Sequence, residues 1–177
     1  MEITEVHTIP IDKMRHGVLG YLVLVRTDAD IIGLGEVAAD CHPDTVAHAI
    51  RQLPLQGWDP LAIEGLWQRF YKGNFWRGGP IYTSAISGVE QALWDIKGKA
   101  LGVPVYQLIG GKLNDRIKLY THTLFGDQSP EAFAASAKEA VDLGYEAVKF
   151  DPLGLAEQRM EREQMRLAVE RVRLTRE

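Results

Sequence analysis

The sequence predicts an α+β fold for residues 1–112, followed by the first two βα units of a parallel sheet in residues 113–177. Strand-like alternation comes first in the chain and helical periodicity follows it, which is the pattern of an α+β unit. Beyond residue 112 the order becomes strand, helix, strand, helix, which is typical of parallel strands joined by crossover helices. The remaining stretch has room for only two βα units of about 30 residues each, so the predicted sheet is incomplete.

Composition narrows the class of protein. The chain has 177 residues, 46% of them hydrophobic and 25% charged, with a formal net charge of −4. These values are typical of a soluble globular protein, and the acidic balance argues against nucleic acid and anionic membrane as partners. The single cysteine, Cys41, cannot form an internal disulfide, and the acidic N-terminus lacks the apolar core of a signal peptide. We therefore expect a cytoplasmic protein.

Three strands are predicted near the N-terminus, at residues 2–11, 21–27 and 31–37. They are rich in Ile, Val and Leu, and an acidic turn at residues 28–30 joins the last two into a hairpin. Gly33-Leu34-Gly35 lacks the third glycine and the following helix of a dinucleotide-binding fingerprint. This segment is therefore predicted to belong to a strand.

Helical periodicity is clearest over residues 81–101, a helix that Gly102 is predicted to end. Its predicted inward residues are Ile86, Val89, Leu93 and Ile96. Asp59-Pro60 has the cap and first-turn proline of a helix start. The other predicted elements are helices at residues 43–53, 61–71 and 129–143, a last helix after Pro152, and strands at residues 116–121 and 147–150.

Three segments together resemble a known family: residues 75–80 (FWRGGP), 87–99 (SGVEQALWDIKGK) and 102–111 (GVPVYQLIGG). They closely resemble the enolase superfamily, in its mandelate racemase and muconate lactonizing enzyme branch, which includes many sugar-acid dehydratases. The resemblance implies that residues 1–112 are the capping domain and residues 113–177 the start of a (β/α)8 barrel, truncated after two units.

The resemblance also implies a chemistry. Members of this family abstract the proton α to a carboxylate, and Mg²⁺ stabilises the negative charge of the resulting enediolate. In the family the metal ligands follow the third, fourth and fifth barrel strands, so the ligands are expected to be absent from this chain. We therefore expect no metal site and no activity in the chain alone, and a Mg²⁺-dependent sugar-acid dehydratase in the parent protein. The implied substrate is a small carboxylate such as an acid sugar.

One catalytic position of the family falls within the chain. The second barrel strand of this branch usually ends in Lys-x-Lys, and here the sequence is Lys149-Phe150-Asp151. Lys149 matches the first lysine, whereas Asp151 replaces the second, which argues against a two-base racemase that uses that lysine. Residues two apart on a strand share a face, so both side chains are candidates for the barrel mouth. Racemisation, epimerisation and cycloisomerisation remain alternatives, and so does a plain solvated strand end.

In the family, two loops of the capping domain close over the substrate. By position these are residues 12–20 and 73–80. The candidate substrate-binding residues on them are Arg15, His16, Asn74, Trp76 and Arg77. Polar residues are the default in loops, and Trp76 and Arg77 have packing of the loop onto the cap as their alternative role. Glu90, Trp94 and Asp95 are expected to hold the cap to the barrel.

Other classes of protein remain to be weighed. A non-catalytic truncated protein that acts through self-association or a partner is the main alternative, and we expect a homo-oligomer in either case. The C-terminal arginines (Arg159, Arg162, Arg166, Arg171, Arg173 and Arg176) alternate with glutamates. This pattern predicts an amphipathic helix with a mixed-charge outer face, rather than a nucleic-acid site. The histidines show no metal-ligand spacing.

Overall fold

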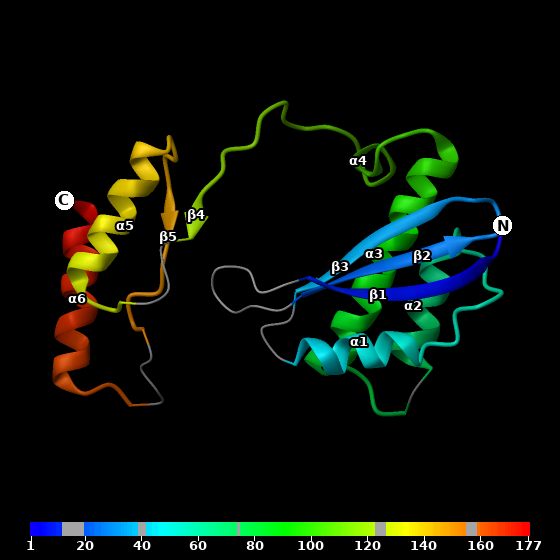
Figure 1. Cartoon of the computed structure of the whole chain (residues 1–177), viewed down its shortest axis with the longest axis horizontal. Coiled ribbons are helices and arrows are strands. Elements are labelled where there is room, and N and C mark those ends of the chain that lie inside the picture. The colour runs from blue at the N-terminus through cyan, green and yellow to red at the C-terminus, as the bar shows by residue number, and fades with distance from the viewer. Residues whose placement is uncertain (12–19, 39–41, 74, 123–126, 155–158) are drawn as a thin grey trace. The chain divides into compact units, whose positions relative to one another are not determined.

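The computed structural model describes residues 1–11, 20–38, 42–73, 75–122, 127–154 and 159–177. The chain forms two compact units, Met1–Leu113 and Asn114–Glu177 (Figure 1). The predicted α+β architecture is confirmed, because the first unit packs a three-stranded antiparallel sheet against helices. Within the described ranges, no helix combines the length and the apolar character that crossing a membrane requires.

The sheet of the first unit consists of β1 (Ile3–Ile11), β2 (Gly20–Thr27) and β3 (Ile32–Ala38), in the order β1-β2-β3. Because β2 is central, it is the most buried strand, and Val23 and Val25 are fully enclosed. The residues that alternate with them point to the other face, where Leu22 and Leu24 are half-buried and Arg26 is exposed. The sheet therefore has one face that packs on a core and one that is more open.

The described residues of this unit form the helices α1 (Pro43–Arg51), α2 (Ile63–Lys72) and α3 (Pro80–Leu101) and the single turn α4 (Val105–Leu108). The long helix α3 runs along one face of the sheet (Figure 1). The four inward residues predicted for α3 are all buried, and Gly102 ends the helix in a left-handed conformation, as predicted.

Two details of these helices differ from the prediction. Helix α2 begins at Ile63 rather than after Asp59-Pro60, because the Asp59 carboxylate accepts a hydrogen bond from the Leu61 amide in a turn before the helix. Helix α4 was not predicted, since a single turn is too short to show helical periodicity.

Glycines allow α3 to lie against β3 at backbone distance. A Cβ atom on Gly33 would lie 2.1 Å from the Ala92 carbonyl oxygen, and one on Gly35 would lie 2.0 Å from the Gly88 carbonyl oxygen. Backbone atoms cannot move away as a flexible side chain would, so these positions have no room for any other residue. The Gly-Leu-Gly segment is a strand segment, as predicted, and its glycines serve helix packing.

The second unit contains β4 (Thr121–His122), β5 (Val148–Lys149), α5 (Pro130–Asp142) and α6 (Arg162–Arg176). The two strands pair in parallel, as the βα pattern predicts. They are shorter than predicted, because a strand is defined by its partner and each pairs over only two residues. The segment before β4 is not a strand, and its Ile117 is 80% exposed. Helix α6 begins at Arg162, later than the predicted start after Pro152, at a capping box formed by Glu161 and Gln164.

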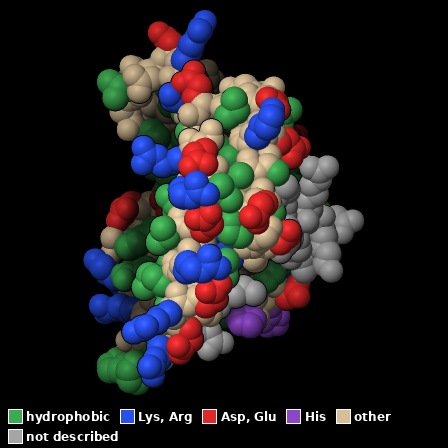
Figure 2. Space-filling view, turned by 90° about the vertical axis from the view of Figure 1, so that its left-hand side faces the viewer, with side chains coloured by type: hydrophobic (Ala, Val, Ile, Leu, Met, Phe, Trp, Pro, Cys, Tyr) green, Lys and Arg blue, Asp and Glu red, His purple; other side chains and the backbone are tan. Residues whose placement is uncertain are grey.

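Helices α5 and α6 pack against each other and enclose a small core. The buried side chains are Pro130, Phe133, Ser136, Ala137 and Ala140 of α5 and Ala168 and Arg171 of α6. On the outer face, Lys and Arg side chains lie among Asp and Glu side chains (Figure 2), as the mixed-charge pattern predicts. Arg171 is the exception to that pattern, since it lies in the core.

Candidate functional site

The carboxyl ends of β4 and β5 bring together residues that lie far apart in the sequence. Because the strands are parallel, the segments that follow them leave from the same edge of the sheet. His122 and Lys149 are paired residues in this register, and each is the last residue of its strand. Both side chains are exposed. The candidate Lys149 thus stands at the strand end where the sequence predicted it.

Asp151 follows the paired part of β5, which ends at Lys149. It lies in a turn, where its Oδ1 accepts a hydrogen bond from the Leu153 amide at 2.9 Å. Lys149 and Asp151 are both exposed, so they do not form a buried pair in this structure.

The cap-loop candidates are only partly described. Arg15, His16 and Asn74 lie outside the described residues. Trp76 is 86% exposed, and its ring contacts Phe75 edge-on, with 5.2 Å between the ring centroids. Arg77 is also exposed. The exposure of Trp76 and Arg77 leaves both available to a ligand and does not fit tight packing onto the cap.

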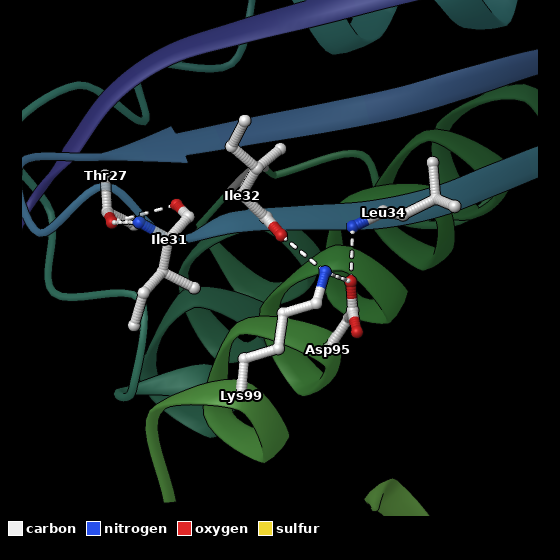
Figure 3. Close-up of polar contacts among 6 residues, drawn as sticks. All are labelled: Thr27, Ile31, Ile32, Leu34, Asp95 and Lys99. Carbon is white, nitrogen blue, oxygen red and sulfur yellow. Dashed lines mark hydrogen bonds and ion pairs between the residues drawn. The ribbon is translucent and has the colours of Figure 1, made fainter. Parts of the chain in front are cut away.

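Polar side chains of α3 bind the outer edge of β3 (Figure 3). Asp95 Oδ2 accepts hydrogen bonds from the Leu34 amide at 2.9 Å and from Lys99 Nζ at 2.6 Å. Lys99 Nζ also donates to the Ile32 carbonyl oxygen at 2.7 Å. Asp95, which we expected to hold the cap to the barrel, therefore acts within the first unit to satisfy a strand edge.

The same helix continues this pattern one turn earlier, where Gln91 accepts a hydrogen bond from the Glu36 amide at 3.1 Å. Gln91, Asp95 and Lys99 recur every four residues, which places them on one side of a helix. Their role was not predicted from the sequence. The available signal was the four-residue spacing of these polar residues on the helix that packs against the strand of Gly33 and Gly35. Just before β3, the Thr27 hydroxyl donates to the Ile31 carbonyl oxygen and fixes the hairpin (Figure 3).

Two carboxylates near the second sheet have lowered pKa values with structural causes. The pKa of Asp127 lies below its ordinary value because the backbone amide and the hydroxyl of Ser129 both donate to it. The pKa of Glu146 is lowered by its hydrogen bond and ion pair with Lys118. These groups order the start of α5 and the approach to β5, and each already has a partner.

A divalent metal ion needs several oxygen ligands in one place. In the part of the chain that the structure describes, no three His, Cys, Asp or Glu side chains come together in a group that can hold a metal ion. The described residues therefore do not fit a Mg²⁺ site.

The sequence matches one family model and several curated proteins. The family model of the mandelate racemase / muconate lactonizing enzyme N-terminal domain matches residues 7–110. A D-galactonate dehydratase from Pectobacterium atrosepticum is 45% identical over 129 residues, which are 72% of this chain and 33% of that protein. A D-galactonate dehydratase from Variovorax paradoxus is 40% identical over 153 residues, which are 85% of this chain and 38% of that protein.

Solved structures match almost the whole chain. A crystal structure from Mesorhizobium loti has 39% sequence identity and a TM-score of 0.90, and the match covers 99% of this chain and 50% of that one. A mandelate racemase/muconate lactonizing enzyme from Jannaschia sp. CCS1 has 34% identity and a TM-score of 0.86, covering 99% of this chain and 51% of that one. The chain thus spans about half the length of these solved relatives and about a third of the curated ones.

Proposed function

Because the chain belongs to the mandelate racemase / muconate lactonizing enzyme family, we propose that it is the N-terminal part of an acid-sugar dehydratase. The observation that carries the proposal is the sequence identity with relatives named D-galactonate dehydratase, which extends over most of this chain. Residues 1–112 are the cap in this proposal, and residues 113–177 are the first two units of the barrel.

The reaction removes water from an acid sugar. One group takes the proton α to the carboxylate, and another gives a proton to the departing hydroxide. The described residues hold no metal-binding cluster, and we place the Mg²⁺ ligands of the whole protein outside this chain. The chain alone is accordingly inactive in this proposal, and the whole protein is a cytoplasmic homo-oligomer.

Lys149 and Asp151 are the residues of this chain that we assign to the barrel mouth. Lys149 is exposed at the carboxyl end of β5, where its ammonium group can form an ion pair with the substrate carboxylate. Asp151 supplies a negative charge two residues further on, and its turn with Leu153 fixes one of its oxygens. Replacement of the second lysine by an aspartate favours dehydration over a racemisation that needs two bases.

The cap contributes substrate recognition in this proposal. Trp76 and Arg77 are exposed, and Gly78 and Gly79, which have positive φ angles of 84° and 88°, turn the chain from them into α3. Together with Arg15, His16 and Asn74, these side chains would recognise hydroxyl and carboxylate groups and exclude water.

The test uses the whole protein with Mg²⁺ and a panel of acid sugars that begins with D-galactonate. We expect Mg²⁺-dependent formation of a keto-deoxy acid, measured by its carbonyl group, and no product from the 177-residue chain. Lys149→Ala should lower kcat/KM by about 10-fold or more, the size of effect that losing an ion pair to the substrate produces. Exchange of the α-proton with solvent and no loss of water would contradict the dehydratase and favour the racemase alternative.

One observation favours the non-catalytic alternative. The second unit exposes Met165, Val169 and Val172 on α6, and exposed apolar surface of this kind promotes self-association. Sedimentation of the 177-residue chain decides whether it has this property. A monomer at micromolar concentration would exclude self-association of the chain as its function.

A further inference from the structure

Arg171 is a charged residue in the core of the second unit. Its side chain is 7% exposed, whereas the neighbouring arginines of α6 lie on the surface. A buried guanidinium is costly unless its N–H groups find acceptors. Arg171 has two, since Nε donates to the Gln128 carbonyl oxygen at 2.8 Å and Nη1 donates to the Pro152 carbonyl oxygen at 2.8 Å.

These two carbonyl groups belong to the two segments that leave the same edge of the parallel sheet. Gln128 lies between β4 and α5, and Pro152 lies between β5 and α6. One rigid guanidinium group therefore ties together the two connections that follow the strands. Pro152 comes directly after Asp151, so the bond holds the backbone next to a proposed site residue.

Aromatic contacts hold the same segment from a second direction. The Arg171 guanidinium lies over the ring of Phe133, 5.4 Å from its centroid. Phe133 in turn contacts Phe150 edge-on, with 5.5 Å between centroids and an interplanar angle of 65°. Phe150 stands between Lys149 and Asp151 in the sequence, so Arg171 supports the backbone on both sides of Asp151.

The local backbone is fitted to this guanidinium. Gly154 has a φ of +62°, and a Cβ atom there would lie 3.2 Å from Arg171 Nη1 and 2.9 Å from Gln128 Oε1. A glycine at this point lets the turn after β5 close onto the arginine. The other arginines of α6 show no such arrangement: Arg166, for example, pairs with Glu163 on its own helix.

We infer that Arg171 is a positioning residue that sets the backbone of residues 149–152 and so directs Lys149 and Asp151 toward the substrate. The inference rests on the proposed function, since it assigns a support to the site residues proposed above. Arg171 itself touches no substrate in this arrangement and acts through the Pro152 carbonyl group and the two phenylalanine rings.

A double-mutant cycle in the whole protein tests the coupling. Arg171→Met and Lys149→Ala should each lower kcat/KM per folded molecule about 10-fold or more, because the first misplaces the group that the second removes. In the double variant the two losses should therefore not multiply, and the loss that Arg171→Met still causes in the Lys149→Ala background measures its support of Asp151. Fully multiplied effects would overturn the inference. Normal activity of Lys149→Ala would instead contradict the proposed role of Lys149, and a whole protein that dehydrates no acid sugar would contradict the proposed function.

Two further variants separate positioning from general stability. Arg166→Met removes an exposed arginine from the same helix and should leave kcat/KM unchanged. Arg171→Lys keeps the charge above Phe133 but loses the planar fork that reaches both carbonyl groups, so it should recover only part of the lost activity. Full recovery by lysine, or an Arg171→Met protein whose folded molecules are fully active, would overturn the inference.

A second measurement does not depend on activity. In NMR spectra of the 177-residue chain, Arg171→Met should shift the backbone amides of residues 127–129 and 150–154, and leave those of the outer faces of α5 and α6 in place. Shifts confined to α6, or spread evenly over both helices, would contradict the bridge between the two segments.

Discussion

Both units expose large apolar side chains, but the first unit also encloses a large core between a sheet and three helices, whereas the second buries only a few side chains between two helices. Sixteen buried hydrophobic residues form one core in the first unit, with contributions from β1, β2, β3, α1, α2 and α3. The exposed large apolar residues of the second unit include Ile117, Leu119, Val141, Leu143, Leu153, Met165 and Val169. Several of them line an open groove of about 730 Å³ along α6.

The two units also differ in how far the strands of their sheets pair. The strands of the first unit pair over seven to eight residues, and side chains of α3 satisfy the outer edge of β3. The second sheet has two strands of two residues each, and sheets of this size are marginal without further packing. We infer from this comparison that the first unit can fold by itself, whereas the second needs additional packing partners.

The largest predicted contrast is between core positions of the two units. Ile96 is fully buried in α3, so Ile96→Ala should lower the free energy of unfolding of the first unit by about 2–5 kcal/mol through lost burial and a cavity. Val169 is 63% exposed on α6, so Val169→Ala should change the free energy of unfolding of the second unit by less than about 0.5 kcal/mol. Denaturant titration followed by NMR reads the two units separately. A large effect of Val169→Ala would mean that the groove is covered.

Close packing between α3 and β3 gives the next contrast. Gly35→Ala should lower the free energy of unfolding by about 1–3 kcal/mol, because its Cβ would meet a backbone oxygen that cannot move aside. Gly65, within α2, is the matched control, since a Cβ there has its nearest neighbour at 4.0 Å. Gly65→Ala should stabilise the protein by about 0.5–1 kcal/mol. Thermal unfolding measures both, and equal effects would contradict the close approach.

The hydrogen bonds of Asp95 at the edge of β3 should contribute less to stability than the close packing of α3 on that strand. Asp95→Ala removes the acceptor of the Leu34 amide and the partner of Lys99, and should cost about 1 kcal/mol, since the site is partly exposed. Asp142 pairs with Lys138 on the surface of α5 at the same spacing, and Asp142→Ala should have no measurable effect. If the two variants behave alike in chemical denaturation, Asp95 contributes nothing beyond a surface ion pair.

The smallest predicted effect is one of pH on the start of α5. Hydrogen bonds from Ser129 lower the pKa of Asp127, so this carboxylate stabilises the folded state above its unfolded pKa. That contribution is lost as the pH falls through the lower, folded pKa. The Ser129 amide resonance should therefore move on acidification, and Asp127→Asn should abolish the movement. An unchanged titration in Asp127→Asn would assign it to another group.

The features that the sequence predicted best are those that depend on a single long helix. The inward face of α3 follows from its periodicity, and its end follows from Gly102, because neither needs knowledge of a partner. The strands at 116–121 and 147–150 were predicted too long, since strand length depends on how far a second strand pairs. The same limit applies to Gly33 and Gly35, whose packing role requires knowing that α3 covers them.

In the candidate site, too, some residues could be predicted from the sequence and others could not. Lys149 was found from its place in a motif at a strand end, and the structure puts it at that end. Arg171 was missed because it stands among the arginines and glutamates of the C-terminal segment, so the charge pattern grouped it with the outer face of α6. Its burial and its contacts with Gln128 and Pro152, which lie 43 and 19 residues away, distinguish it from the exposed arginines.

Separate expression of residues 1–113 and 114–177 tests the difference between the units most directly. Thermal unfolding of each piece, followed by circular dichroism, should show a cooperative transition for residues 1–113 at the temperature at which the first unit unfolds in the whole chain. Residues 114–177 should unfold over a broader range at a lower temperature. A sharp transition of residues 114–177 at an equal or higher temperature would contradict the claim that the second unit is incomplete.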